Sequence, residues 1–300
     1  MTRGRFGKGI QMNRIFRDRR RGLMVGAMAL AAGLVVAGLA APALASQTAT
    51  PAGGQAAIDE MVQKYDHPMG SQIRKHEGTA DMPPRSFDPA DVLPQATVPG
   101  IDVSGHQGNV DWPAQWNAGK RFVWAKATEG TGYQNPYFSQ QYNGSFNQGF
   151  IRGAYHFALP DRSSGAAQAN FFSNNGGGWS GDGKTLPGAL DMEYNPYGAT
   201  CYGLSKASMT NWIRDFSNTY KARWNKYPAI YTSTSWWNQC VGSSFGSTNP
   251  LWVARYAGSV GTLPIGWSTH TVWQYSSTPI DQNSFNGAYD RLVVFATNHD

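Results

Sequence analysis

The stretch that decides the fold is a short apolar run ending in two acids, Pro187-Gly188-Ala189-Leu190-Asp191-Met192-Glu193-Tyr194. It predicts a buried strand over Pro187–Glu193, in which successive side chains point to opposite faces. Asp191 and Glu193 then share one face, with Cα atoms about 6–7 Å apart. Two buried acids are costly unless they are paired or functional. Taken alone, the pair would also fit an exposed strand end whose acids are solvated.

Strands and helices alternate on both sides of this stretch. The expected strands are Val98–Val103, Phe122–Ala127, Ile151–Ala158, Ala229–Thr232, Leu251–Arg255 and Thr271–Tyr275. The expected helices are Trp112–Ala118, Tyr137–Gln148, Gly165–Asn174 and Lys206–Trp224. This alternation favours a parallel sheet, and about eight strands in about 200 residues predict a compact α/β barrel. Helical patterns weaken after Cys240, where we expect a loop-rich closure.

Most of the expected strands end in polar or aromatic side chains. These residues are Asp102, Tyr155, His156, Asp191, Glu193, Tyr231, Arg255, Tyr256, Gln274 and Tyr275. In a parallel barrel the carboxyl ends of the strands converge on one face, where active sites form. We therefore place the candidate site at this face. Asp102 has a turn cap as its alternative, and Asp281, in a polar loop, taken alone would more often be a turn residue.

The basic character of the chain belongs to its first 45 residues. The net charge of +6 comes from 25 basic and 19 acidic residues, of which residues 1–45 hold eight and one. The remainder has a net charge of −1, which gives no electrostatic reason to bind nucleic acid. Residues 1–45 are typical of a signal peptide, with an uncharged run over Leu23–Ala45 that ends in Ala-Leu-Ala. An uncleaved anchor is the alternative, and Arg20-Arg21 leaves Sec and Tat export open.

Composition changes at Val98, because all eleven Trp residues follow it. We expect the compact domain, which carries the candidate site, at residues 98–300. Residues 46–97 fit a linker or a surface-wrapping N-terminal extension, with a short helix near Ile58–Tyr65. A removed pro-segment is the alternative for this part of the chain.

The only cysteines, Cys201 and Cys240, both lie in the Trp-rich part of the chain. Export makes a disulfide between them the expected state, and two separate buried thiols are the alternative. No His or Cys spacing resembles a zinc site, so we expect neither a metal nor another cofactor.

The acid pair suits catalysis on a glycan. Burial and a neighbouring carboxylate both raise the pKa of a carboxyl group, so that a protonated Glu193 could donate to a glycosidic oxygen. Aromatic rings stack on the apolar faces of sugars, while amides and acids bind their hydroxyl groups. The runs that fit such a cleft are Tyr155-His156-Phe157, Trp236-Trp237 and Trp273-Gln274-Tyr275.

Five motifs occur together in one order: VPGIDVSGHQG (98–108), AKATEG (125–130), GAYHF (153–157), ALDME (189–193) and WQY (273–275). In this order they resemble glycoside hydrolase family 25, the secreted N-acetylmuramidases called cellosyl-type or Chalaropsis-type lysozymes. The resemblance covers about residues 98–295. It implies an irregular TIM-like (β/α) barrel with fewer helices than strands. It also implies hydrolysis of the β-1,4 bond between N-acetylmuramic acid and N-acetylglucosamine.

Carried over motif by motif, the resemblance implies a role for each site residue. Glu193 matches the general acid and Asp191 its partner carboxylate, and Asp102 and Asp281 match two further acids. The implied substrate-binding residues are Tyr155, Tyr231, Trp273, Gln274 and Tyr275.

The acid pair also bears on mechanism. Because Asp191 and Glu193 share one strand face, we expect the N-acetyl group of the substrate to attack the anomeric carbon, as in chitinases. Inversion, with Asp102 or Asp281 as base, is the alternative.

The expected partner is therefore the glycan strand of peptidoglycan. We expect a secreted or cell-wall-associated monomer with no nucleic-acid partner and no membrane insertion after signal cleavage. Three alternatives remain: a chitinase-like hydrolase, a non-catalytic cell-wall lectin, and an exported structural domain. The intact pair of Asp191 and Glu193 argues against the lectin, and the polar strand ends argue against the structural domain.

Overall fold

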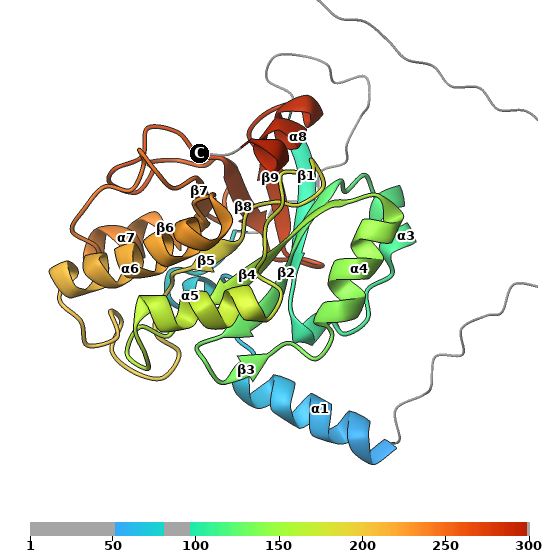
Figure 1. The fold of residues 1–300 in the computed structure, drawn as a ribbon, viewed down its shortest axis with the longest axis horizontal. Helices are drawn as coiled ribbons and strands as arrows, with labels where there is room; N and C mark the ends of the chain where they lie inside the picture. The colour runs from blue at the N-terminus through green and yellow to red at the C-terminus, as the bar shows by residue number, and fades with distance from the viewer. Residues whose placement is uncertain (1–51, 81–96, 299–300) are drawn as a thin grey trace, which may run out of the picture. The chain divides into compact units, whose positions relative to one another are not determined.

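Eight strands close into a ring in the computed structural model, which describes residues 52–80 and 97–298 (Figure 1). Their order around the ring is β1, β9, β8, β7, β6, β5, β4 and β2, and the pairing of β2 with β1 completes the circle. A ninth strand, β3, pairs with the end of β2 outside the ring. The bounds are β1 (Val98–Val103), β2 (Phe122–Glu129), β3 (Tyr133–Gln134), β4 (Ile151–Phe157), β5 (Ala189–Asp191), β6 (Ala229–Ser233), β7 (Leu251–Ala254), β8 (Val272–Ser276) and β9 (Gln282–Phe285). The predicted irregular α/β barrel is confirmed.

Strand β9 departs from the parallel pattern, because it runs antiparallel to both β1 and β8. We expected a polar loop around Asp281. This prediction is wrong for Gln282–Phe285, which is a strand of the ring. The strand was not recognised in the sequence because most of its residues are polar. The Asn283 side chain contacts Asp102 and Trp252 inside the barrel, so a polar residue occupies a buried strand position. A polar interior removes the apolar alternation by which strands are recognised.

Six α-helices follow residue 97 in the described chain, fewer than the eight strands of the ring, as expected. They are α3 (Trp112–Asn117), α4 (Phe138–Gln148), α5 (Gly165–Asn174), α6 (Lys206–Trp224), α7 (Thr234–Cys240) and α8 (Tyr289–Thr297). The helices predicted at 165–174 and 206–224 coincide with α5 and α6. Residues 241–288 contain no helix, as expected, but neither α7 nor α8 was predicted. None of the helices in 52–80 and 97–298 has the length and apolar character needed to cross a membrane.

Two helices precede the barrel: α1 (Ala52–Tyr65) and α2 (Ser71–Glu77). The helix expected near Ile58–Tyr65 is thus longer than predicted. Both helices belong to the same compact unit as the barrel. The signal peptide expected at 1–45 lies outside the described residues.

The amino-end half of the barrel interior is filled by aromatic rings. The Trp124 ring lies 5.7 Å from that of Phe122 and 4.6 Å from that of Trp252, measured between centroids. Phe285 from β9 packs on Phe122 at 6.5 Å. Gly153 makes room for this cluster, because a Cβ on it would lie 2.5 Å from the Trp124 ring nitrogen. This packed half supports the carboxyl ends of the strands above it.

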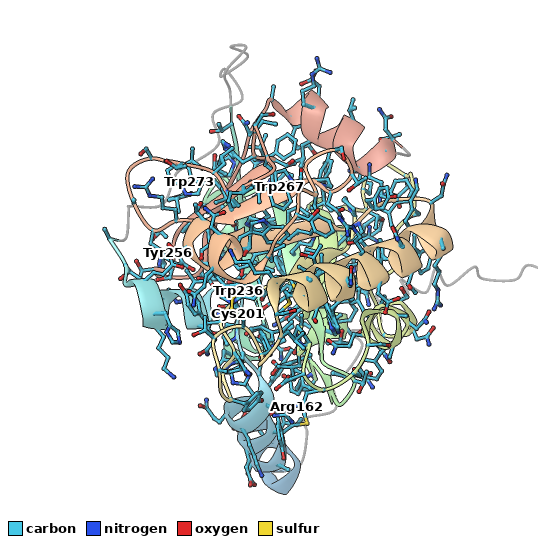
Figure 2. The ribbon with its side chains drawn as sticks, turned by 90° about the vertical axis from the view of Figure 1, so that its left-hand side faces the viewer. Arg162, Cys201, Trp236, Tyr256, Trp267 and Trp273 are labelled. Carbon is cyan, nitrogen blue, oxygen red and sulfur yellow. A yellow bond between two sulfur atoms is a disulfide. The ribbon has the colours of Figure 1, made fainter. Side chains whose placement is uncertain are left out.

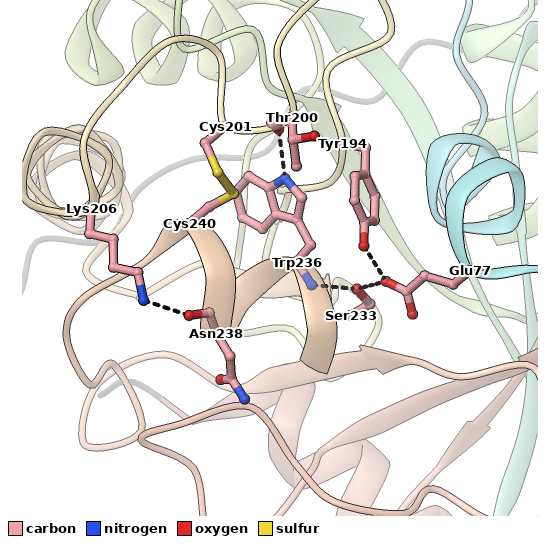
Figure 3. The surroundings of a disulfide bond; sticks show 9 residues. All are labelled: Glu77, Tyr194, Thr200, Cys201, Lys206, Ser233, Trp236, Asn238 and Cys240. Atoms are coloured by element: carbon pink, nitrogen blue, oxygen red, sulfur yellow. Dashed lines mark hydrogen bonds between the residues drawn. A yellow bond between two sulfur atoms is a disulfide. The ribbon is translucent and has the colours of Figure 1, made fainter.

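The predicted disulfide joins Cys201 to Cys240, with the two Cα atoms 5.4 Å apart (Figure 3). It ties the loop after β5 to the end of α7. Trp236 lies beside it, and its ring N–H donates to the Thr200 carbonyl at 3.0 Å. The disulfide thus anchors the loop that continues from Asp191 and Glu193.

Candidate active site

The two acids of the β5 stretch meet at the carboxyl end of the barrel. Asp191 is the last residue of β5, and the extended backbone continues because the Met192 amide donates to the Tyr231 carbonyl at 2.9 Å. Asp191 and Glu193 therefore point the same way. Both side chains are fully buried.

Burial dominates the electrostatics of this pair. It raises the pKa of Asp191 well above its usual range, and the neighbouring charge of Glu193 raises it further. Burial raises the pKa of Glu193 to about 7, although three backbone N–H groups and Arg74 oppose that rise. Among the described groups, neither carboxyl oxygen of Asp191 has a hydrogen-bond donor. Burial of the pair therefore favours the protonated form of these acids over two negative charges.

Asp102, at the end of β1, anchors a hydrogen-bond network across the barrel. Its Oδ2 accepts from the Gln274 amide at 2.8 Å and from the Asn283 amide at 2.7 Å. Gln274 Oε1 in turn accepts from the Tyr231 hydroxyl at 2.6 Å and the Tyr256 hydroxyl at 2.5 Å. Burial raises the pKa of Asp102 to about 6. Asp102, Tyr231 and Gln274 thus lie together, as the sequence led us to expect.

Tyr155 and Asp281 complete the set of expected residues at this face. Tyr155 on β4 is fully buried, and its hydroxyl accepts from the Met69 amide at 3.2 Å. Asp281, just before β9, is 5% exposed and pairs with Arg74 at 2.9 Å. Both contacts come from residues that precede the barrel in sequence.

Other residues expected in the cleft are not brought to it. Trp273 and Tyr275 pack in a separate cluster with Leu251 and Val253, on the face opposite Gln274. Strand alternation is the reason, because Gln274 faces the interior and its two neighbours must face outward. Trp236 and Trp237 are fully buried in the core.

His156 likewise faces away from its neighbour Tyr155. Its ring packs against Phe172 and Phe216 and bonds to Gln168 at 2.9 Å. Burial lowers its pKa to about 4, which keeps it neutral at pH 7. His156 is a packing residue of the barrel wall.

A buried cation was missed by the sequence analysis. Lys126 on β2 is fully buried, and its Nζ lies 2.7 Å from both Asp66 and Glu129. Glu129 also lies 2.7 Å from the ring of His67. Strand alternation from Trp124 offered a signal for Lys126, since residues two apart share a face. Nothing in the sequence indicated that Asp66 and His67 would join it.

Two of the hollows at this face lie on either side of the acid pair. One, of about 470 Å³, is lined by Glu129, Tyr133 and Tyr197 of the barrel and by Tyr65. The other, of about 280 Å³, is lined by Thr234 and Arg255 and by Glu77. The first adjoins the ends of β2 and β4 and the second those of β6 and β7, so they lie on opposite sides of β5. The buried acid pair thus lies at the end of β5, between the two hollows.

This arrangement can perform acid catalysis on an extended neutral polymer. It offers a protonated acid pair, hydroxyl and amide groups for hydrogen bonding, and space on both sides of the pair. No group of three His, Cys, Asp or Glu side chains in the described ranges is placed to hold a metal ion.

Comparison with known proteins places this geometry in a family. The family described as "Glycosyl hydrolases family 25" matches residues 101–284. Lysozyme M1 of Streptomyces globisporus is 46% identical over 91% of this chain and 95% of its own length. The N,O-diacetylmuramidase of Chalaropsis sp. is 50% identical over 67% of this chain and 100% of its own length. The muramidase structure from Acremonium alcalophilum matches 67% of this chain and 99% of that chain, with a TM-score of 0.65 and 56% identity. The chain belongs to glycosyl hydrolase family 25.

Proposed function

We propose that the barrel hydrolyses the β-1,4 bond between N-acetylmuramic acid and N-acetylglucosamine in peptidoglycan. The observation that carries this proposal is the buried pair of Asp191 and Glu193, which lies between two hollows at the carboxyl end of the barrel. The relatives named lysozyme and N,O-diacetylmuramidase support the choice of substrate. We further propose that the chain is secreted, because its leader has the pattern of a signal peptide. We propose that it acts on glycan strands as a monomer.

Glu193 serves as acid and then as base in this mechanism. Its carboxyl proton passes to the glycosidic oxygen as the bond to the anomeric carbon breaks. The carbonyl oxygen of the substrate's own N-acetyl group attacks that carbon and forms an oxazolinium. The Glu193 carboxylate then removes a proton from water, and the water oxygen attacks the anomeric carbon. This attack opens the oxazolinium ring and restores the N-acetyl group. Acid and base are regenerated in one turnover.

Asp191 orients the N-acetyl group and stabilises the positive charge of the oxazolinium. Its two buried oxygens have no donor among the described residues, which suits them to accept the acetamide N–H. Asp102 is the weaker candidate for a base, because two amides hold its Oδ2 in the hydrogen-bond network. Participation of the N-acetyl group is favoured over direct attack by water because Asp191 and Glu193 share one strand face.

Product analysis tests the reaction. Mass spectrometry of peptidoglycan digests should find N-acetylmuramic acid at the new reducing end. Glu193→Gln keeps the shape of the side chain but removes its transferable proton, so turnover should fall by about 10²-fold or more. A new reducing end on N-acetylglucosamine, or cleavage of chitin alone, would overturn the substrate assignment.

The anomer of the first product tests the mechanism. Two successive inversions at the anomeric carbon give net retention, so proton NMR of early product should show the β-anomer. An initial α-anomer would instead assign the base role to Asp102 or Asp281.

A further inference from the structure

Residues 66–77, called here the cleft segment, lie directly on the catalytic acid. The backbone N–H of Gly70 donates to Glu193 Oε1 at 2.7 Å. Those of Gln72 and Ile73 donate to Glu193 Oε2 at 2.8 and 3.0 Å. A general acid must come within about 2.6–3.2 Å of the oxygen that it protonates. Because both oxygens already have donors at that distance, no glycosidic oxygen can reach Glu193.

The charges of the cleft segment match those of the groove. Asp66 pairs with the fully buried Lys126 at 2.7 Å, and Arg74 pairs with Asp281 at 2.9 Å. Near the end of the segment, Glu77 accepts from the hydroxyl groups of Tyr194, at 3.0 Å, and Ser233 (Figure 3). Each charged residue of the segment named here thus meets a complementary group of the barrel. Charge complementarity along the whole length of a contact is typical of a bound ligand.

Burial of apolar side chains adds to these pairs. Met69 and Ile73 are 0% and 1% exposed and belong to the same core cluster as Tyr155 and Tyr231. Arg74 also bonds to Tyr256, which lies beside α2 at this face (Figure 2). The segment is therefore packed into the groove like part of the core.

Gly70 is the residue at which the cleft segment approaches the tyrosine hydroxyl groups of the barrel most closely. Its φ is +76°, a left-handed conformation that favours glycine. A Cβ at this position would lie 2.0 Å from the Tyr256 hydroxyl oxygen and 2.5 Å from that of Tyr231. The groove thus admits this stretch of chain only because residue 70 has no side chain.

About two thirds of this chain is enough to match one relative in full. The Chalaropsis enzyme is matched along 100% of its length by 67% of this chain, a share equal in length to residues 97–298. The match to Lysozyme M1 covers 91% of this chain and must include much of what precedes the barrel. The two relatives thus differ in how much of this chain they match, and only the match to Lysozyme M1 must extend well beyond the length of the barrel.

From these contacts we propose that the cleft segment is an autoinhibitor, which fills the catalytic groove and must leave before a glycan can bind. This inference rests on the proposed function. The two hollows beside the acid pair lie on either side of the segment, which therefore closes the groove only at the scissile bond. Attachment to the barrel keeps the segment at a high effective concentration, so a soluble substrate competes poorly with it.

The test compares three proteins in a dye-release assay on cell walls. The chain from residue 97 onward should be at least tenfold more active than the chain that retains residues 52–80. Gly70→Ala in the longer chain should recover activity by threefold or more, because the new Cβ expels the segment. Gly53→Ala is the matched control, since a Cβ there meets nothing within 4 Å. Equal activity of the longer and shorter chains would overturn the proposal.

A binding measurement separates this proposal from the proposed function. Titration calorimetry with a synthetic peptide of residues 64–80 should show one site on the chain from residue 97. The same peptide with Gly70→Ala should bind at least tenfold more weakly. Absence of binding by the unmodified peptide would refute autoinhibition whatever the activity. If the peptide binds but no protein cleaves peptidoglycan, the segment fills the groove and the proposed reaction is wrong.

Discussion

The two halves of the barrel interior are built from opposite kinds of side chain. At the amino end the rings of Phe122, Trp124 and Phe285 pack on one another. At the carboxyl end Asp102 on β1 and Asp191 on β5 point into the barrel, and both are buried. Burial of rings stabilises a fold, whereas burial of acids costs free energy unless partners compensate them. The comparison shows that one end of the barrel maintains the fold and the other maintains the chemistry.

The largest effect that we predict is at the apolar end. Trp124→Ala removes a fully buried ring and its hydrogen bond to the Pro187 carbonyl. The free energy of unfolding should fall by about 3–5 kcal/mol. Phe146→Ala, at a ring that is 45% exposed, is the control and should cost no more than about 1 kcal/mol. Denaturant titration measures both. Similar losses for the two variants would contradict the comparison.

The next effect is at the polar end and depends on pH. Burial raises the pKa of Glu193 from 4.5 to about 7 in the folded chain, so folding favours its protonated form. The resulting stabilisation is complete below pH 4.5 and is lost as pH rises through 7. Glu193→Gln removes this contribution. The stability advantage of the wild type over the variant should therefore shrink by up to about 3 kcal/mol between pH 4.5 and 8.

Denaturant titrations of the chain that retains residues 52–80, at a series of pH values, measure this difference. The exposed Gln63 on α1 gives the control, because Gln63→Ala changes no titratable group. A wild-type advantage that grew with pH would show that Glu193 is stabilised as a carboxylate in the folded chain.

The smallest effect distinguishes the two faces of β8. Trp273 lies outside the interior, so Trp273→Phe should change turnover by less than about threefold at a stability cost of about 1 kcal/mol. Gln274→Met on the inner face removes the amide between Asp102 and Tyr231, and turnover should fall about tenfold or more. Both are measured on the chain from residue 97. A larger loss of turnover for Trp273→Phe than for Gln274→Met would indicate that Trp273 lies in the cleft.

Much of the barrel could be predicted from the sequence because its strands and helices follow strong local patterns. The strand at 98–103 and the helices at 165–174 and 206–224 have the predicted bounds. The approach of Asp102, Asp191 and Gln274 also followed from a general property of parallel barrels, in which the carboxyl ends of the strands share one face.

The errors have physical causes of two kinds. Strand β9 was hidden because Asn283 serves the buried site rather than an apolar core. Trp273 and Tyr275 were placed in the cleft by their residue type, although alternation allows only Gln274 to face inward. A surface-wrapping extension was one of the interpretations of residues 46–97. The position of the cleft segment on Glu193 was not predicted, since complementarity between Arg74 and Asp281 is visible only after the chain has folded.

The position of β9 has a consequence for the order in which the molecule forms. One of the two neighbours of β1, the first strand, is supplied by residues 282–285, so the ring cannot close until almost the whole chain has been synthesised. The bonds from Gly70 to Glu193 and from Arg74 to Asp281 span 123 and 207 positions. Pairings of such long range form late in folding. The cleft segment is therefore synthesised before every strand of the ring. Its partner Asp281 is synthesised only just before the last strand, β9. A newly made molecule completes its groove with the occupant of that groove already attached.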